Sequence, residues 1–267
     1  MAFDEMDVEL IWQDGEFVDW DDAQVHVLTH GLHYGTGVFE GVRCYDTAEG
    51  PAIFRWDAHL ERFYESAKPY DMEIPYDPEE LTEATLELVR RQPFDGCYIR
   101  PIAFYGYNEL GLNPSNCPVE VAIAAWPWGA YLGEEALEEG VDVAISSWRK
   151  YGSDQIPTNA KTTGPYVNSV LASLEARGND YVEAILLNAQ GKVAEGPGEN
   201  LFLVRDGEIF TPGLAEANLD GITRQSVIQI ARDLGYTVNE HATISRGELY
   251  TADELFFTGT AAEVTPI

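Results

Sequence analysis

Apolar residues in the first half of the chain change their spacing between segments. Offsets of 0, 3, 4 and 7 predict two helices, in residues 57–67 and 78–91, each packed by one face on a sheet. Continuous or alternating apolar runs predict strands at residues 97–106 and 119–126. Because the second of these runs is almost entirely apolar, we expect it to be buried on both faces.

The second half mixes helices, strands and hairpins. A helix is predicted from about Pro165, with Val167, Val170, Leu171 and Leu174 at offsets 0, 3, 4 and 7. The pairs Asp14-Gly15 and Asp206-Gly207 separate apolar runs and predict hairpin turns. The remaining predicted elements are a helix over residues 222–235 and strands at 141–148, 183–188, 200–204 and 208–212. This order favours an α+β architecture over a doubly wound parallel sheet.

One stretch that is rich in proline, glycine and acid divides the chain. We therefore expect a small N-terminal α/β domain over residues 1–127 and an interdomain connection over residues 128–140. A larger C-terminal α/β domain is expected over residues 141–267.

The net charge changes this picture more than any other aspect of the composition. The chain has 46 acidic and 16 basic residues, a net charge of −30, while 45% hydrophobic residues support a folded core. Such a field repels nucleic acid and anionic membranes, so we expect neither as a partner. Because molar salt shortens the screening length to roughly 3 Å, the acidic surface favours a halophilic host.

Cysteine and histidine spacing indicates no structural cross-link or metal. Cys44, Cys97 and Cys117 are odd in number and lack a CxxC spacing. His30 and His33 are spaced H-x-x-H, but without a third ligand in view no metal site is predicted. The acidic N-terminus is unlike a signal peptide, and no apolar run reaches the ~20 residues of a spanning helix. We therefore expect a cytoplasmic protein.

Lys161, one of only four lysines, lies between proline and glycine in the run IPTNAKTTGPY. Taken alone, the local sequence favours a surface loop lysine. The alternative is an amine held in a pocket, where desolvation lowers its pKa and allows a Schiff base to form.

Three further segments have both an ordinary structural explanation and a chemical one. Glu195 and Glu199 border a Gly-Pro-Gly turn, which is either a solvated hairpin loop or a place for a carboxylate beside a cationic ring nitrogen. Residues 220–225 begin a helix whose free N–H groups suit a phosphate. Residues 258–261 form a small-residue turn that could present N–H groups to a ligand. The glycine-rich segment 29–45 adds an aromatic wall that an apolar substrate could contact.

Eight motifs in order make a more specific signal than any of them alone. HYGTGVFEG, HLERF, YIRP, PWGAYLG, IPTNAK, EGPGENLF, GITR and TGTAAE resemble the branched-chain amino acid aminotransferases, members of the fold-type IV pyridoxal phosphate enzymes. The resemblance runs from about Ile11 to the last residue. It implies a two-domain architecture similar to D-amino acid aminotransferase, with the cofactor at the domain interface. It also implies ping-pong transfer of the amino group between L-leucine, L-isoleucine or L-valine and 2-oxoglutarate.

The resemblance assigns residues to the cofactor, pyridoxal 5'-phosphate. It implies that Lys161 forms the Schiff base and moves the proton at Cα, that Glu195 faces the pyridine nitrogen, and that Tyr166 bonds the phenolic oxygen. The phosphate is expected to meet Arg62, Gly221, Ile222, Thr223 and Thr260. Asp220 beside this group would be unfavourable unless its side chain points away.

The same resemblance implies a pocket for branched-chain L-amino acids, glutamate and their 2-oxo acids. Arg100 is expected to meet the distal carboxylate of glutamate, because its fork makes a directed, charge-assisted bond. The other implied substrate residues are Tyr34, Phe39, Gly41, Arg43, Tyr98, Trp128, Tyr131, Thr260 and Ala261.

Several alternatives stay open at the level of the sequence. The family implies at least a homodimer, with a hexamer as the larger option, and a final segment beyond Ile267. Rival activities on the same fold are D-amino acid transaminase and aminodeoxychorismate lyase. A non-catalytic ligand-binding homologue is less favoured, because Lys161 and Glu195 are both retained.

Overall fold

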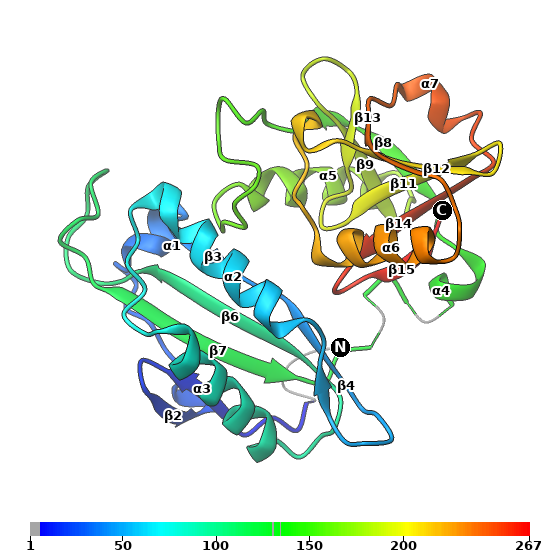
Figure 1. The fold of residues 1–267 in the computed structure, drawn as a ribbon. Helices are drawn as coiled ribbons and strands as arrows, with labels where there is room; N and C mark the ends of the chain where they lie inside the picture. Colours follow the sequence, from blue (N-terminus) through cyan, green and yellow to red (C-terminus); the bar gives the residue numbers. More distant parts are fainter. Residues whose placement is uncertain (1–5, 130, 134) are drawn as a thin grey trace. The chain divides into compact units, whose positions relative to one another are not determined.

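The computed structural model describes residues 6–129, 131–133 and 135–267, which divide into two compact units (Figure 1). Unit 1 runs to Trp128 and also includes Ala160–Gly164, and unit 2 comprises Gly129–Asn159 and Pro165–Ile267. Residues 1–5, and Ala130 and Glu134 of the expected connection, lie outside the described residues.

The division differs from a simple boundary after residue 127, because a short segment returns to unit 1. Within that return the Thr163 N–H donates to Gly37 O at 2.8 Å, and the Phe39 N–H donates to Lys161 O at 3.1 Å. Gly35 and Gly164 allow this pairing, since a Cβ on Gly35 would lie 2.5 Å from Gly164 Cα. The lysine of interest is therefore held by unit 1 although it lies far along the chain.

Unit 1 is built on an antiparallel sheet with strand order β2-β1-β7-β6-β4-β5, to which β3 is added through β6. Helices α2 and α3 cover one face of this sheet (Figure 1). The element bounds are β1 Leu10–Gln13, β2 Glu16–Asp19, α1 His30–Tyr34, β3 Gly37–Phe39, β4 Val42–Tyr45, β5 Ala52–Ile53, α2 Trp56–Ala67, α3 Pro78–Arg91, β6 Cys97–Tyr105 and β7 Val119–Trp126.

The two predicted helices of unit 1 and their apolar faces are confirmed. Asp77 caps α3 reciprocally with Glu80, and Pro78 occupies the first turn, where a missing N–H costs nothing. Leu60 and Phe63 on α2, like Leu88 on α3, are buried against the sheet. The predicted hairpin at Asp14 is also confirmed, by antiparallel pairing of β1 with β2.

The expectation that β7 is buried on both faces is wrong. Val121, Ile123 and Ala125 are fully buried under the helices, whereas the intervening Ala122 and Ala124 are only half-buried. Alternate side chains point to opposite faces of a strand, and α2 and α3 pack on the face that Val121, Ile123 and Ala125 share. Both alanines instead line a cavity on the other face.

Unit 2 contains two sheets, β10-β9-β8 and β13-β12-β11-β14-β15. β8 pairs with β9, and β12 with β13, in parallel, while the other recorded pairs are antiparallel. The bounds are α4 Ala136–Glu139, β8 Val143–Arg149, α5 Tyr166–Gly178, β9 Glu183–Leu187, β10 Val193–Glu195, β11 Asn200–Arg205, β12 Glu208–Pro212, α6 Ile222–Asp233, β13 Val238–Ala242, α7 Arg246–Leu249, β14 Glu254–Gly259 and β15 Glu263–Pro266. The α+β prediction is confirmed.

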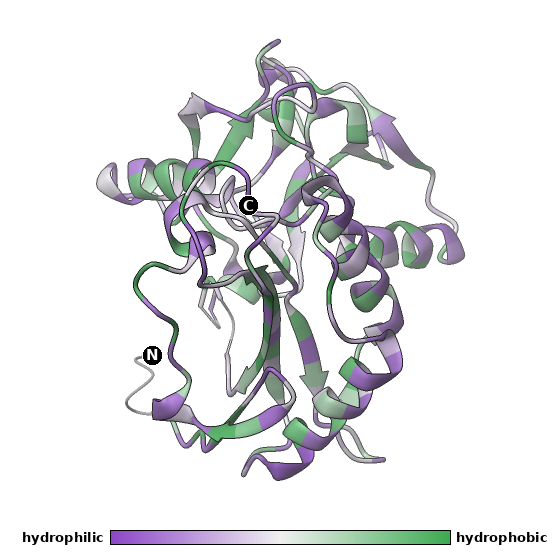
Figure 2. Cartoon of the chain, turned by 90° about the vertical axis from the view of Figure 1, so that its left-hand side faces the viewer, coloured by the Kyte–Doolittle hydropathy of each residue, from purple (hydrophilic) through white to green (hydrophobic). Residues whose placement is uncertain are grey.

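Helix α5 forms where predicted, but its larger apolar residues do not face the sheet. Val167, Val170 and Leu174 are exposed by 64%, 54% and 62%. Ala172 and Ala176 are buried instead, packed in one cluster with residues of β9. Small side chains let a helix approach strands closely, and this close packing overrides the apolar repeat. Figure 2 shows that hydrophilic residues are spread over both units rather than gathered in one segment.

Candidate active site

Strand alternation brings several substrate residues implied by the resemblance onto one face of the unit 1 sheet. Phe39 pairs with Ile102, and Arg43 pairs with Tyr98. Because directly opposed residues share a face and every second residue returns to it, Arg100 lies on this face as well. The face is the one turned away from α2 and α3.

Aromatic rings surround the cations on this face. The Arg100 guanidinium carbon lies 4.7 Å from the centroid of the Phe39 ring and 5.3 Å from that of Tyr98. Its Nη2 donates to Tyr98 Oη at 3.1 Å, and its Nε is buried without a hydrogen-bond partner among the described residues. Arg43 donates through Nη1 to Trp128 O at 2.5 Å, and the Trp128 ring lies 4.6 Å from Tyr98. The arrangement joins an apolar wall to a donor-rich arginine.

Gly41 has a specific steric reason to be glycine. A Cβ at this position would lie 1.8 Å from Tyr98 Oη and 2.7 Å from Cζ of the same ring. Any larger residue would therefore displace Tyr98, and with it the hydroxyl that accepts from Arg100.

The other aromatic residues implied for the substrate lie in different settings. Tyr34 is exposed by 43% and packs its ring 4.6 Å from that of His30. His30 contacts Thr36 Oγ1 through Nδ1 and Gly111 O through Nε2, and His33 Nε2 contacts Val27 O. These bonds give both histidines structural roles. Tyr131 belongs to unit 2 and is half-exposed.

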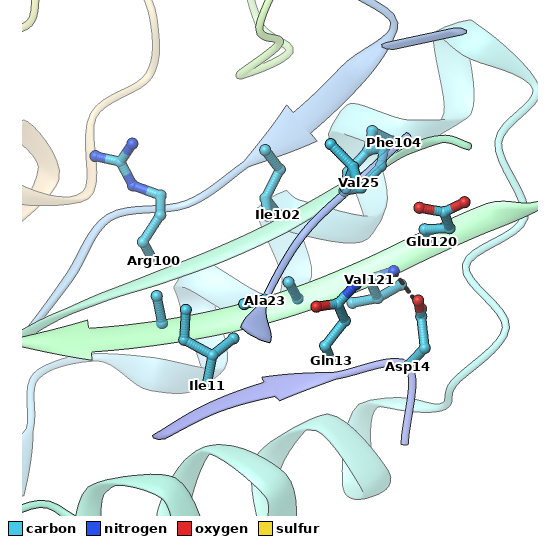
Figure 3. Close-up of a pocket in the computed structure, with 12 residues that line it drawn as sticks. Ile11, Gln13, Asp14, Ala23, Val25, Arg100, Ile102, Phe104, Glu120 and Val121 are labelled. Carbon is cyan, nitrogen blue, oxygen red and sulfur yellow. Dashed lines mark hydrogen bonds between the residues drawn. The ribbon is translucent and has the colours of Figure 1, made fainter. Parts of the chain in front are cut away.

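A cavity of about 210 Å³ lies on the same face of the unit 1 sheet. Figure 3 shows Arg100 at one end and Glu120 at the other, with Ile102 and Phe104 between them. Asp14 accepts from the Val121 N–H at 2.7 Å at the rim. The cavity is mainly apolar and has one cation at its end.

Lys161 is fixed by backbone contacts on both sides of its Cα. Its N–H donates to Ser66 Oγ at 2.9 Å, and its carbonyl accepts from Phe39 as described above. The side-chain Nζ lies 5.0 Å from the centroid of the Phe39 ring. A lysine held in this way is not a mobile surface residue.

A buried carboxylate, Glu40, organises the polar face of α2. Arg62 donates to its two oxygens through Nε at 2.7 Å and Nη2 at 2.9 Å, and His59 Nδ1 contacts Oε2 at 2.7 Å. Burial alone would raise the pKa of Glu40, but the charge of Arg62 and the bonds from His59 and Arg62 lower that pKa to about 2. Burial lowers the pKa of His59, and Glu40 offsets part of this effect.

Helical spacing explains how α2 places the side chains that bind Glu40 and the backbone of Lys161. His59, Arg62 and Ser66 fall at offsets 0, 3 and 7, so they lie along one stripe of the helix. The stripe therefore holds both the arginine implied for the phosphate and, through Ser66, the backbone of Lys161.

Glu195 is the corresponding buried carboxylate of unit 2. Lys150 Nζ lies 2.6 Å from Oε1, while Oε2 accepts from the Leu219 N–H at 2.9 Å and from Asn200 Nδ2 at 3.2 Å. Burial on its own lowers the pKa of Lys150, but the charge of Glu195 outweighs it and raises that pKa above its ordinary value. The ring of Tyr151 lies 4.7 Å from the same Nζ.

The turn after Glu195 and the start of α5 have the predicted local structure. Residues 196–199 connect β10 to β11, and the Gly196 N–H donates to Glu199 O at 2.7 Å. Glu199 is buried and accepts from the Gly198 N–H. Tyr166 is the first residue of α5.

The start of α6 offers backbone donors. Gly221 is the residue before the helix, and a Cβ there would lie 2.0 Å from Asn200 Oδ1, so only glycine fits without movement. Ile222 and Thr223 form the first turn, whose N–H groups lack intrahelical acceptors. Thr260 and Ala261 lie in the tight turn between β14 and β15.

Asp220 does not add an uncompensated charge to this helix start. Its oxygens accept from Arg224 Nη1 at 3.2 Å and from Gln225 Nε2 at 3.0 Å, both on α6. Arg224 is itself buried and also donates to Glu240 O at 2.8 Å.

Sequence reasoning missed the residues that hold the site residues in place. Glu40, His59, Ser66 and Lys150 were not singled out, although all four are buried. One signal was available, since three polar residues at helical spacing on an otherwise apolar helix face require buried partners. Their partners lie far along the chain and could not be read from local pattern.

Comparisons with known proteins identify the family of this chain. The family model described as amino-transferase class IV matches residues 37–267, so the chain belongs to the class IV aminotransferases. A branched-chain-amino-acid aminotransferase of Pseudomonas aeruginosa is 52% identical over 97% of this chain and 83% of its own length. The enzyme of the same name from Escherichia coli is 48% identical over 97% of this chain and 84% of its length.

Solved structures agree on the fold. The crystal structure of the Escherichia coli enzyme superposes with a TM-score of 0.95 at 48% identity, covering 97% of this chain and 86% of that one. A T.th. branched-chain amino acid aminotransferase with pyridoxamine 5'-phosphate gives a TM-score of 0.94 at 55% identity, covering 98% and 86%. These neighbours confirm the predicted fold-type IV architecture. Among the described residues, no helix has the length and apolar character needed to cross a membrane.

Proposed function

We propose that this protein is a pyridoxal 5'-phosphate-dependent transaminase that exchanges the amino group of L-leucine, L-isoleucine or L-valine with that of L-glutamate. One observation carries the proposal. Lys161 is held at its backbone by Ser66 and Phe39, with its amine over the Phe39 ring, in a chain that belongs to the class IV aminotransferases.

The donors present fit the proposed cofactor. Arg62 in unit 1 and the first turn of α6 in unit 2 carry the kinds of donor that suit a phosphate dianion. Glu195 in unit 2 is an anionic carboxylate held by Lys150, which suits a protonated ring nitrogen. When bound, the cofactor supplies an aldehyde carbon that carries the amino group and a ring that accepts electrons from Cα.

Lys161 then has two tasks of its own. Its amine would be the group that links to the aldehyde carbon of the bound cofactor, and the free amine would move a proton between the substrate Cα and that carbon. The fixed backbone on both sides of Lys161 limits where Nζ can reach, which keeps the proton transfer to one face of the substrate.

The aromatic face of unit 1 suits two unlike side chains. Phe39 and Tyr98 offer apolar surface to a branched-chain side chain, while Arg100 between them can donate to the distal carboxylate of glutamate. The Nε of Arg100, buried without a partner among the described residues, supports a role for this cation in binding an acceptor.

The proposal includes a homo-oligomer in the cytoplasm of a halophile. Two segments tied by the bond from His30 to Gly111 present a cluster of exposed apolar side chains, which suits a second copy of the chain. The charge of −30 on each chain requires screening, which supports a salt-rich cytoplasm. The exposed cluster comprises Val25, Val27, Leu28, Leu32, Tyr34, Tyr107, Leu110 and Leu112.

The test is transfer of labelled nitrogen in molar potassium chloride. L-leucine labelled with ¹⁵N is incubated with 2-oxoglutarate and the purified protein, and labelled glutamate is measured by mass spectrometry. We expect transfer from L-leucine and none from D-alanine. Lys161→Ala should lower the rate by about 10²–10⁴-fold, while the matched control Lys68→Ala, at an exposed lysine, should keep it. Transfer from D-alanine alone would point to the D-amino acid transaminase, and none from either would overturn the proposal.

A further inference from the structure

Two cysteines lie directly opposite each other in the sheet of unit 1. Cys44 on β4 pairs with Cys97 on β6, and both are buried in the core cluster under the helices. The Cys44 thiol donates to Asp95 O at 3.9 Å. The two neighbouring thiols act on each other, which lowers the pKa of Cys44 and, together with burial, raises the pKa of Cys97. The pair is therefore a dithiol of unequal acidity rather than two independent cysteines.

The backbone pairing sets the distance between them. The Glu40 N–H donates to Pro101 O at 2.9 Å, and the register continues without a shift from Val42 opposite Ile99 to the cysteine pair. Hydrogen-bonded and non-hydrogen-bonded pairs alternate, so the cysteines occupy a hydrogen-bonded pair with a Cα separation of about 5.5 Å. Disulfides span Cα separations of about 4.4–6.8 Å, so no strand movement is required.

We propose that Cys44 and Cys97 form a reversible intramolecular disulfide when the protein meets a peroxide. The thiolate of Cys44 attacks one peroxide oxygen, the O–O bond breaks, and Cys44 becomes a sulfenic acid as hydroxide leaves. The sulfur of Cys97 then attacks the Cys44 sulfur, its proton leaves with the hydroxyl as water, and the S–S bond forms. Two thiols are oxidised and one peroxide is reduced to two waters.

The position of the pair explains both access and reversibility. Cys97 is the first residue of β6, and the preceding residues Asp95 and Gly96 are exposed, so the pair lies where a ladder frays most readily. Fraying at this strand end also admits a dithiol reductant, which makes the disulfide reversible.

The disulfide would also restrain the neighbouring pair of residues on the two strands. Arg43 pairs with Tyr98 immediately beside the cysteines, on the opposite face of the sheet. Tying β4 to β6 therefore reduces fraying at the strand positions that carry these two proposed substrate residues. The disulfide itself does not depend on the proposed function, so either can fail without the other.

The experiment titrates the purified protein with hydrogen peroxide and follows intact mass and free thiols counted after denaturation. The wild type should lose about 2 Da as two hydrogens leave, and its thiol count should fall from three to one. Dithiothreitol should restore both. Hydrogen exchange at the amides of residues 42–44 should slow in the oxidised form.

Substitutions identify the partners. Cys44→Ala and Cys97→Ala should each abolish the 2 Da loss, while the matched control Cys117→Ala, at the third buried thiol, should keep it. Peptide mapping of the oxidised wild type should recover the two segments as one linked species, so the answer does not depend on the variants folding. A linkage through Cys117, a gain of oxygen without cross-linking, or disulfide-linked dimers would overturn the proposal.

Discussion

Two buried carboxylates, Glu40 in unit 1 and Glu195 in unit 2, are held by cations in different ways. Glu40 is fixed by the planar fork of Arg62, which occupies both oxygens, and by His59. Glu195 is fixed by the point charge of Lys150 on one oxygen and by an amide N–H and Asn200 on the other. The first arrangement is rigid in orientation, and the second is fixed mainly by its backbone donor.

The difference has a functional meaning. An arginine cannot lose its proton in a protein, so the partly buried charge of Arg62 persists, and Glu40 sets the direction of the guanidinium. The ammonium of Lys150 stays charged, because Glu195 raises its pKa, but it is a point charge on a flexible stem and does not fix the plane of the carboxylate. The Arg62 pair therefore suits a fixed anchor, and the Lys150 pair suits a carboxylate that meets a ring nitrogen.

The largest effect on stability is expected when Glu40, the carboxylate that binds Arg62, loses its charge. Glu40→Gln leaves the partly buried Arg62 opposite a neutral amide, which should lower the free energy of unfolding by about 3–5 kcal/mol. Urea unfolding in molar potassium chloride measures this. The matched control is Glu87→Gln, which breaks an exposed pair with Arg91 at the same distance of 2.7 Å and should cost less than about 1 kcal/mol. Equal losses of unfolding free energy in Glu40→Gln and Glu87→Gln would refute the expected difference between the two ion pairs.

The acid dependence of stability should identify the same carboxylate. The pKa of Glu40 is lowered from 4.5 to about 2 in the folded chain, so its contribution is complete above its unfolded pKa and is lost as pH falls through about 2. That contribution corresponds to about 3 kcal/mol. The difference in unfolding free energy between wild type and Glu40→Gln should therefore shrink from pH 5 to pH 2. A difference that stays constant over this range would contradict the assignment.

A smaller effect is expected in unit 2. Lys150→Met removes the cation from Glu195 but leaves the Leu219 N–H and Asn200 as donors to the other carboxylate oxygen, so the free energy of unfolding should fall by about 1–3 kcal/mol. Lys150→Arg keeps the charge and should recover most of that loss. Urea unfolding measures both variants, and a cost for Lys150→Met above that of Glu40→Gln would reverse the comparison.

Local pattern was sufficient for the elements but not for the partners. The helices of unit 1 and the hairpin at Asp14 follow from apolar spacing and turn chemistry, which act over a few residues. The packing of α5 could not be predicted, because Ala172 and Ala176 approach the sheet more closely than the larger apolar residues can. Close approach depends on the opposing strands, which the helix sequence does not describe.

The same distinction between local pattern and distant partners applies to the candidate site. Lys161 and Arg62 could be singled out by motif, and their roles remain predictions. Glu40 lies 22 residues from Arg62, and Ser66 lies 95 residues from Lys161, so both contacts arise only when the sheet and the return segment have formed. Long-range pairs of this kind leave no periodic trace in one sequence.

The smallest effect concerns salt, and it separates buried pairs from the acidic surface. Raising potassium chloride from 0.1 M to 2 M should stabilise the wild type, because screening reduces repulsion among the exposed carboxylates of a chain with a charge of −30. The cost of Glu40→Gln should change by less than about 0.5 kcal/mol over this range, because a buried pair is screened little. Urea unfolding of both proteins at each salt concentration provides the measurement. If the loss of unfolding free energy caused by Glu40→Gln fell as salt rose, solvent ions would have to reach Glu40 and Arg62. The Glu40–Arg62 pair would then be no more rigid than the Glu87 pair.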